Sequence, residues 1–199
     1  MKVLIATTNL GKVQIYKQAF VELGIEVCSL RDLHIDIDVE ENGNSEIENA
    51  IIKAKAYHKI TNMPVLANDS GLVIDRFSKE DQPGLLVRRY NGKELTDQEM
   101  LNVYVQKLNQ VGGESSGHYN VGLAIIDQNG ILHTKEFKPQ RYFINKPSST
   151  IIKGVPLSSL CYDFKTKKYL SEMTAKERND YEGEEFLGQI NFIKECFSK

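Results

Sequence analysis

The start of the chain constrains its fold most strongly. Val3–Ala6 is a continuous apolar run, typical of a strand buried on both faces. Thr7–Gly11 then supplies turn chemistry, and a second strand is expected over Glu26–Leu30. Between them, apolar residues repeat at helical spacing and end at a glycine stop, namely Val13, Tyr16, Ala19, Phe20, Leu23 and Gly24. This strand–loop–helix–strand order predicts an α/β fold.

Three pairs of Ser or Thr with Glu three residues later predict the starts of further helices. The pairs are Ser45/Glu48, Thr96/Glu99 and Thr174/Glu177. The first helix is expected to reach about Ile60, the second to end near Gly112-Gly113, and the last to include Phe186, Ile190, Ile193 and Phe197.

Short apolar runs predict the other strands. Expected extended segments are Val65–Ala67, Leu72–Ile74, Tyr119–Ile126, Ile131–Phe137 and Tyr142–Ile152, with a hairpin turn at Asn129-Gly130. Arg31–Asn44 and Gly113–Gly117 are expected to be loops, although the latter matches G-x-S-x-G by letter. No repeat or linker interrupts the pattern, so we expect residues 1–199 to form one α/β domain with a mixed sheet.

Composition and charge exclude several classes of protein. Hydrophobic residues make up 41% and charged residues 26%, as in a folded globular domain. A net charge of −2 gives no footprint for nucleic acid or an anionic membrane. The apolar runs are far shorter than the ~20 residues of a membrane span, and the N-terminus lacks the apolar core of a signal peptide. We therefore expect a cytoplasmic protein.

The cysteines and histidines are not spaced as in a metal site or a set of disulfides. Three cysteines, Cys28, Cys161 and Cys196, are far apart and odd in number, so buried free thiols are expected. The histidines at 34, 58, 118 and 133 lack metal-ligand spacing. The short lysine run at 165, 167 and 168 is assigned no function.

The first candidate site is Thr7-Thr8-Asn9-Leu10-Gly11-Lys12, between a buried strand and a helix. Backbone N–H groups at a helix start, the positive end of the helix dipole and a lysine together stabilise a phosphate. The Walker and dinucleotide-binding glycine patterns are both absent. The alternative is an ordinary turn with a solvated lysine.

The second candidate is the acidic run Asp36, Asp38, Glu40 and Glu41, which precedes a helix that carries Asn49 and Lys53. Asn49 and Lys53 are spaced i, i+4 and share one helix face. Carboxylates suit a divalent cation, and Lys53 could meet a phosphate. The alternative is a solvated charged loop.

The third candidate is Asn68-Asp69-Ser70-Gly71, at the end of an apolar strand. Ligands of open α/β sheets collect at the carboxyl ends of strands. Asp69 is placed there to bind a metal or to accept a proton from water. A simple turn is the alternative.

In order and spacing these motifs resemble the inosine/xanthosine triphosphate pyrophosphatase family, over at least residues 1–110. The resemblance is carried by Ala6-Thr7, Asn9, Gly11-Lys12, Glu40-Glu41, Gly43, Ile47–Ala50, Lys53-Ala54, Asp69–Leu72, Asp75, Pro83-Gly84, Arg89-Tyr90 and Thr96–Gln98. It implies a two-lobed α/β fold around a long mixed sheet with flanking helices. It also implies a homodimer, with the nucleotide between the lobes.

The resemblance further implies Mg²⁺-dependent cleavage, with Mn²⁺ as a possible substitute, of a nucleoside triphosphate to monophosphate and pyrophosphate. Asp69 would be the general base, and Glu40 or Glu41 together with Asp69 would bind the metal. The expected substrate contacts are Thr7, Thr8, Asn9, Gly11, Lys12, Asn49, Lys53, Ser70, Arg89, Tyr162, Asp163 and Arg178.

The second half departs from the family pattern. Leu160-Cys161-Tyr162-Asp163 replaces Phe-Gly-Tyr-Asp, Arg178 replaces a lysine, and Glu182-Gly183-Glu184 replaces a Ser-His-Arg that reads the base. Ionised carboxylates cannot donate hydrogen bonds to a carbonyl. We therefore expect a pyrophosphatase of noncanonical purine nucleotides, such as ITP, dITP or XTP, with altered base preference. The alternative is a nucleotide-binding regulatory or inactive relative.

Overall fold

The structure is a computed structural model that describes residues 1–21, 23–37 and 39–197, except for some side chains within helices. The chain forms two compact units. Unit 1 comprises Met1–Ser70, Val121–Phe137 and Leu187–Lys199, and unit 2 comprises Gly71–Asn120 and Lys138–Phe186. The three free cysteines are buried, as expected.

The sheet is mixed, which confirms the predicted α/β class. In the order β2-β1-β3-β6-β7, β1 is parallel to β2 and β3, and β6 is antiparallel to β7 and also to β8. The strands are β1 (Lys2–Ile5), β2 (Glu26–Ser29), β3 (Val65–Ile74), β6 (Glu114–Ile126), β7 (Leu132–Phe137) and β8 (Gln140–Ile144). Strands β3 and β6 contribute to both units.

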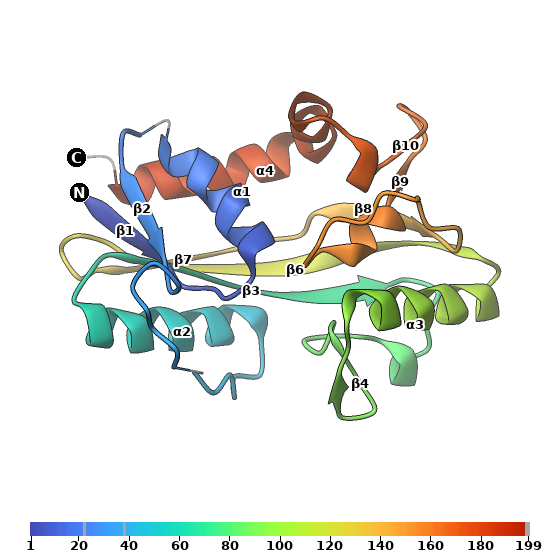
Figure 1. Ribbon diagram of the computed structural model, residues 1–199, viewed down its shortest axis with the longest axis horizontal. Helices are drawn as coiled ribbons and strands as arrows, with labels where there is room; N and C mark the ends of the chain where they lie inside the picture. Colours follow the sequence, from blue (N-terminus) through green and yellow to red (C-terminus); the bar gives the residue numbers. More distant parts are fainter. Residues whose placement is uncertain (22, 38, 198–199) are drawn as a thin grey trace. The chain divides into compact units, whose positions relative to one another are not determined.

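In unit 1, helices cover both faces of the sheet (Figure 1). Helix α1 (Leu10–Val21) and the C-terminal part of α4 (Ala175–Phe197) lie on one face, and α2 (Glu46–Thr61) lies on the other. Val3, Leu4 and Ile5 of β1 are at most 1% exposed, because each face of this strand is covered. The continuous apolar run at the start of the chain therefore predicted this buried strand correctly.

The capping patterns start the helices where expected. Ser45 Oγ accepts the Glu48 N–H at 3.3 Å, but the Glu48 carboxylate accepts the backbone N–H of Asn44 instead of that of Ser45. The other two pairs, at Thr96 and Thr174, form both bonds of the capping box. Helix α4 is interrupted at Gly183, where φ is 50° and ψ is −136°.

In unit 2, α3 (Asp97–Gln110) covers one face of the sheet, and the β9–β10 hairpin lies on the other (Figure 1). The remaining elements are η1 (Lys79–Asp81), β4 (Arg89–Tyr90), β5 (Lys93–Glu94), η2 (Pro156–Ser159), β9 (Tyr162–Asp163), β10 (Lys168–Tyr169) and η3 (Leu170–Glu172). No helix of the described residues is long and apolar enough to cross a membrane.

Two predictions about unit 2 were wrong. Gly113–Gly117 was expected to be a loop, but β6 begins at Glu114, where this polar segment pairs with β8. Extended structure was expected as far as Ile152, but β8 ends at Ile144, and the N–H of Ser148 then bonds the carbonyl of Ser159. In both cases, hydrogen bonding to another segment of the chain determined the local backbone structure.

Gly122 of β6 allows the start of α2 to approach the sheet closely. A Cβ atom at Gly122 would lie 2.6 Å from the Ile47 nitrogen and 2.7 Å from the Glu46 carbonyl carbon. These are backbone atoms, so they cannot move away as the end of a side chain could. The first turn of α2 therefore rests directly on β6.

We expect Gly122→Ala to lower the free energy of unfolding by about 1 to 3 kcal/mol, because the added methyl group must displace α2. Urea unfolding of the variant measures the loss. Thr134→Ala, at an exposed position of the neighbouring strand β7, is the control and should change stability by less than about 0.5 kcal/mol. A Gly122→Ala variant as stable as this control would contradict the close contact.

Candidate functional site

The strand order creates a switch point between β1 and β3. From β1 the chain passes through α1 to β2 on one side, and then through α2, on the opposite face, to β3 on the other side. Ligands of doubly wound sheets bind where the order reverses in this way, beyond the carboxyl ends of the strands. The first motif follows β1, and the third lies within β3, so the fold brings both to this point. The prediction that the strand ends at Ala67 was wrong, because β3 continues through Asn68–Gly71 to Ile74.

Lys12 connects the two motifs. Its Nζ donates a hydrogen bond to Ser70 Oγ at 3.1 Å, across from α1 to β3. The start of α1 is ordered locally, because Asn9 Oδ1 accepts the Lys12 N–H and Thr7 Oγ1 accepts the Asn9 N–H. Burial and the charge of Lys53 lower the pKa of Lys12 to about 8, while the charges of Asp69 and Glu41 oppose this change.

Asp69 is held by two side chains of α2. Asn49 Nδ2 donates to Asp69 Oδ2 at 3.0 Å, and Lys53 Nζ lies 3.4 Å from Asp69 Oδ1. The spacing of Asn49 and Lys53 by one helical turn allows both to reach the same carboxylate. The prediction that they share a face beside the apolar one is therefore confirmed.

Lys53 also holds the acidic loop. Its Nζ lies 2.8 Å from Glu41 Oε2, and its side chain is only 12% exposed. The loop is fixed a second time, because Asn49 Oδ1 accepts the Gly43 N–H at 2.8 Å. A Cβ at Gly43 would lie 2.8 Å from Asn49 Oδ1, so only glycine fits. Glu40 is exposed and makes no ion pair with a residue that the structure describes.

Two of the predicted metal ligands, Glu41 and Asp69, both pair with the ammonium group of Lys53. Among the described residues, no group of three or more His, Cys, Asp or Glu side chains is arranged to hold a metal ion. Glu41 and Asp69 nevertheless present the hard oxygen atoms that Mg²⁺ prefers, and both face Lys53. This donor set fits a divalent cation, and the metal site stays a prediction.

Thr8 lies apart from this network. It is exposed and lines a cavity of about 410 Å³ together with residues that follow β2, namely Leu30, Arg31, His34, Ile35 and Asp36. The described part of the chain does not include the Leu10 side chain or the surroundings of Gly11. Asp38 also lies outside it.

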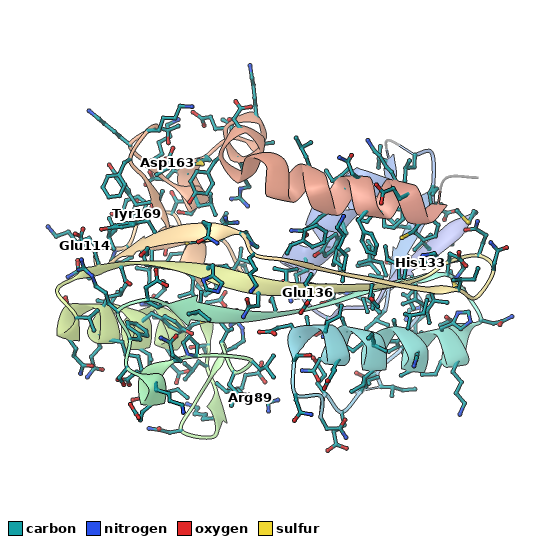
Figure 2. The ribbon with its side chains drawn as sticks, turned by 180° about the vertical axis from the view of Figure 1, so that it is seen from behind. Arg89, Glu114, His133, Glu136, Asp163 and Tyr169 are labelled. Atoms are coloured by element: carbon teal, nitrogen blue, oxygen red, sulfur yellow. The ribbon has the colours of Figure 1, made fainter. Side chains whose placement is uncertain are left out.

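The other four predicted substrate residues belong to unit 2. Figure 2 shows Arg89 and Asp163 on opposite faces of this unit's sheet, so the fold does not bring them together. Asp163 accepts the N–H groups of Lys165 and Thr166 and so closes the β9–β10 turn. The Tyr162 ring contacts two aromatic rings, those of Phe164 and Tyr169, and the Arg178 guanidinium donates to the Leu170 carbonyl.

Two residues at the site were named in sequence motifs but were given no role of their own. Gly43 was noted only as part of a motif, although its N–H anchors Asn49. Asn68 is 4% exposed, and its Oδ1 has no hydrogen-bond partner in the described part of the chain. Strand alternation was the signal available for Asn68, since it shares a face of β3 with Ser70.

The fold and the side-chain network define an α/β protein in which two lysines and two carboxylates lie together at a sheet switch point. The chain belongs to the Ham1 family, whose model matches residues 3–153. This confirms the resemblance stated from the sequence motifs.

Similar proteins include two curated relatives named dITP/XTP pyrophosphatase. The one from Halalkalibacterium halodurans is 30% identical over 177 residues, 88% of this chain and 89% of the relative. The one from Escherichia coli K12 is 37% identical over 110 residues, so that the match spans about half of each chain, 55% and 54%.

Solved structures support the same fold. The Coxiella burnetii HAM1 protein superposes with a TM-score of 0.74 at 24% identity, covering 98% of this chain and 99% of that one. The Staphylococcus aureus Ham1 protein gives a TM-score of 0.72 at 22% identity, with the same coverage.

The double role of Asn49 can be tested by substitution. Asn49→Leu should lower the free energy of unfolding by about 1 to 3 kcal/mol for each group left unpaired, the Gly43 N–H and Asp69 Oδ2. Asn49→Asp keeps the acceptor for Gly43 but places a second carboxylate against Asp69. Its loss of stability should shrink on acidification, because a protonated carboxyl can donate again.

Urea unfolding at neutral and acidic pH measures both variants. Asn102→Asp, at an exposed position of α3, is the matched control. If Asn49→Asp and Asn102→Asp lose the same stability at every pH, Asn49 does not hold Asp69.

Proposed function

We propose that the protein is a nucleoside triphosphate pyrophosphatase that hydrolyses noncanonical purine nucleotides such as ITP, dITP or XTP to monophosphate and pyrophosphate. The observation that carries this proposal is the network of Lys12, Ser70, Asp69, Asn49 and Lys53 at the switch point. Membership of the Ham1 family and the names of the relatives support a hydrolase of phosphoric anhydride bonds.

In this reaction, water attacks the α-phosphorus, and the bond from that phosphorus to the bridging oxygen of pyrophosphate breaks. Asp69 accepts the proton of the water, and Asn49 keeps the carboxylate oriented. Lys12 and Lys53 compensate the negative charge of the phosphates. Mg²⁺ or Mn²⁺, held by Glu41 and Asp69 with Glu40 as an alternative ligand, would supply further positive charge to the phosphate oxygens.

Base recognition is the part of the function for which the chain offers least. Leu160 and Cys161, at the position where the related pattern has Phe-Gly, are 0% and 1% exposed in the core of unit 2, so neither offers a surface to a base. The side chains of Glu182 and Glu184 lie outside the described residues. We propose weaker discrimination between ITP and ATP than a site built with hydrogen-bond donors would give.

The buried core position of Leu160 and Cys161 also favours the second candidate, a nucleotide-binding relative without useful turnover. The homodimer and the cytoplasmic location stay predictions. The two candidate functions differ in one measurable property, the release of pyrophosphate.

We expect release of pyrophosphate and nucleoside monophosphate from ITP, dITP or XTP with Mg²⁺, loss of activity with EDTA, and recovery with Mg²⁺ or Mn²⁺. Values of kcat/KM for ITP, dITP, XTP, ATP, GTP and dUTP measure the preference. Asp69→Asn should lose about 10² to 10⁴ in rate, whereas Asp75→Asn, at an exposed carboxylate of unit 2, is the control. Nucleotide binding without turnover would favour the second candidate.

The lowered pKa of Lys12 predicts the pH dependence of triphosphate binding. Lys12 loses its charge as the pH rises through about 8, so affinity for a non-hydrolysable triphosphate should fall there by about tenfold or more. In Lys12→Arg the charge persists and the fall near pH 8 should disappear. Calorimetry from pH 6.5 to pH 9.5 tests this, and a wild-type affinity independent of pH over this range would contradict it.

A further inference from the structure

An acceptor without a partner and an ammonium group with spare N–H donors lie on the α1 side of β3. The buried Oδ1 of Asn68 accepts no hydrogen bond in the described part of the chain. The Lys12 ammonium has three N–H donors, of which Ser70 accepts one, and no other acceptor for it is found among the described residues. A buried acceptor without a partner destabilises the folded protein, so a chain that retains one needs a reason.

The geometry of strand and helix places these groups close together. Side chains alternate along β3, so Asn68 and Ser70 share the face toward α1, roughly 6.6 Å apart along the strand. Asp69 points to the other face, where α2 holds it. Because Lys12 reaches Ser70, its ammonium lies beside the same face that carries Asn68.

The next turn of α1 contributes a second buried polar pair. Helix α1 connects two parallel strands and therefore runs antiparallel to β3. Tyr16 follows Lys12 by one helical turn and so lies further back along the strand. Its hydroxyl donates to Gln189 Oε1 at 3.3 Å in the buried interior. Asn68 is thus placed between the Lys12–Ser70 pair and the Tyr16–Gln189 pair.

We propose that Asn68 is a positioning residue for Lys12, whose ammonium donates a second hydrogen bond to Asn68 Oδ1 and is thereby held beside the middle of β3. A rotation of the flexible lysine side chain brings donor and acceptor together and satisfies both. The consequence for catalysis rests on the proposed function, because the positioned charge is the one that meets the phosphates. The hydrogen bond itself does not depend on that function.

The test measures Lys12 in the ligand-free protein, without any assay of activity. The rate at which acetic anhydride acetylates Lys12 is followed by mass spectrometry as a function of pH, in the wild type, Asn68→Leu and Asn68→Asp. The charges that Lys12 senses from Lys53, Asp69 and Glu41 are the same in all three proteins. Changes in the midpoint therefore report on position 68.

Asn68→Leu removes the acceptor, so the pH midpoint of Lys12 acetylation should fall below the wild-type value. Asn68→Asp supplies a charged acceptor, so the pH midpoint of Lys12 acetylation should rise by about 1 to 3 pH units. Ser171→Ala is the matched control, because it removes the other such atom of the described residues, a buried hydroxyl of unit 2 without a partner, and should leave the pH midpoint unchanged. Circular dichroism verifies the fold, and the leucine variant alone decides if the aspartate variant does not fold.

A wild-type midpoint in folded Asn68→Leu would overturn the proposal. A second arm measures kinetics with the preferred nucleotide. There, Asn68→Leu should raise KM about tenfold with little change in kcat, because a charged hydrogen bond that positions a binding group is lost. If the protein shows no turnover, the proposed function fails, and the acetylation midpoints still decide the role of Asn68.

Discussion

The carboxylate of Asp69 is the group around which the site is organised. It lies in the middle of the central strand β3, and one helix face supplies both its amide donor and its ammonium partner, Asn49 and Lys53. A half-buried carboxylate needs such partners, because burial without them costs several kcal/mol. The position of α2 therefore decides the geometry of Asp69, and the contact of Gly122 with the first turn of α2 sets that position.

Because side chains alternate along β3, Asp69 and Ser70 contact different helices. Asp69 faces α2, whereas Ser70 and its lysine partner face α1. The two ammonium groups, Lys12 and Lys53, therefore approach the middle of β3 from opposite sides of the sheet. Burial and the repulsion from Lys53 lower the pKa of Lys12, and a bound polyanion would oppose this effect. Under the proposed function, the arrangement suits a ligand with several negative charges better than one with a single charge.

Local sequence patterns predicted the elements and residues of unit 1 well. The apolar run Val3–Ala6 and the cap at Ser45 mark β1 and α2 within a residue or two. The i, i+4 spacing placed Asn49 and Lys53 on one face. The pairing of Lys53 with Glu41 could not be read from the sequence, because it depends on how the loop before α2 folds back.

Long-range pairing explains the failures in unit 2. Glu114–His118 has the polar composition of a loop, and only its partner β8 makes it a strand, with alternate side chains such as Ser115 buried. The hairpin of β4 and β5 was missed, although Asn91-Gly92 at its turn is a strong local signal, with φ values of 50° and 76°.

In the proposed function, phosphate binding and base selection depend on separate parts of the chain. Among the described residues, every contact that holds Asp69, Lys12 and Lys53 comes from unit 1. The departures in the second half of the chain, at Leu160, Cys161, Arg178 and Glu182–Glu184, fall in unit 2. Thr8, which replaces a glycine of the related pattern, lies in unit 1 but contributes none of these contacts. Substitutions in unit 2 leave the charged network without any lost partner, so base preference can change while the phosphate site stays intact. An altered specificity is therefore physically easier to reach in this chain than a loss of phosphate chemistry.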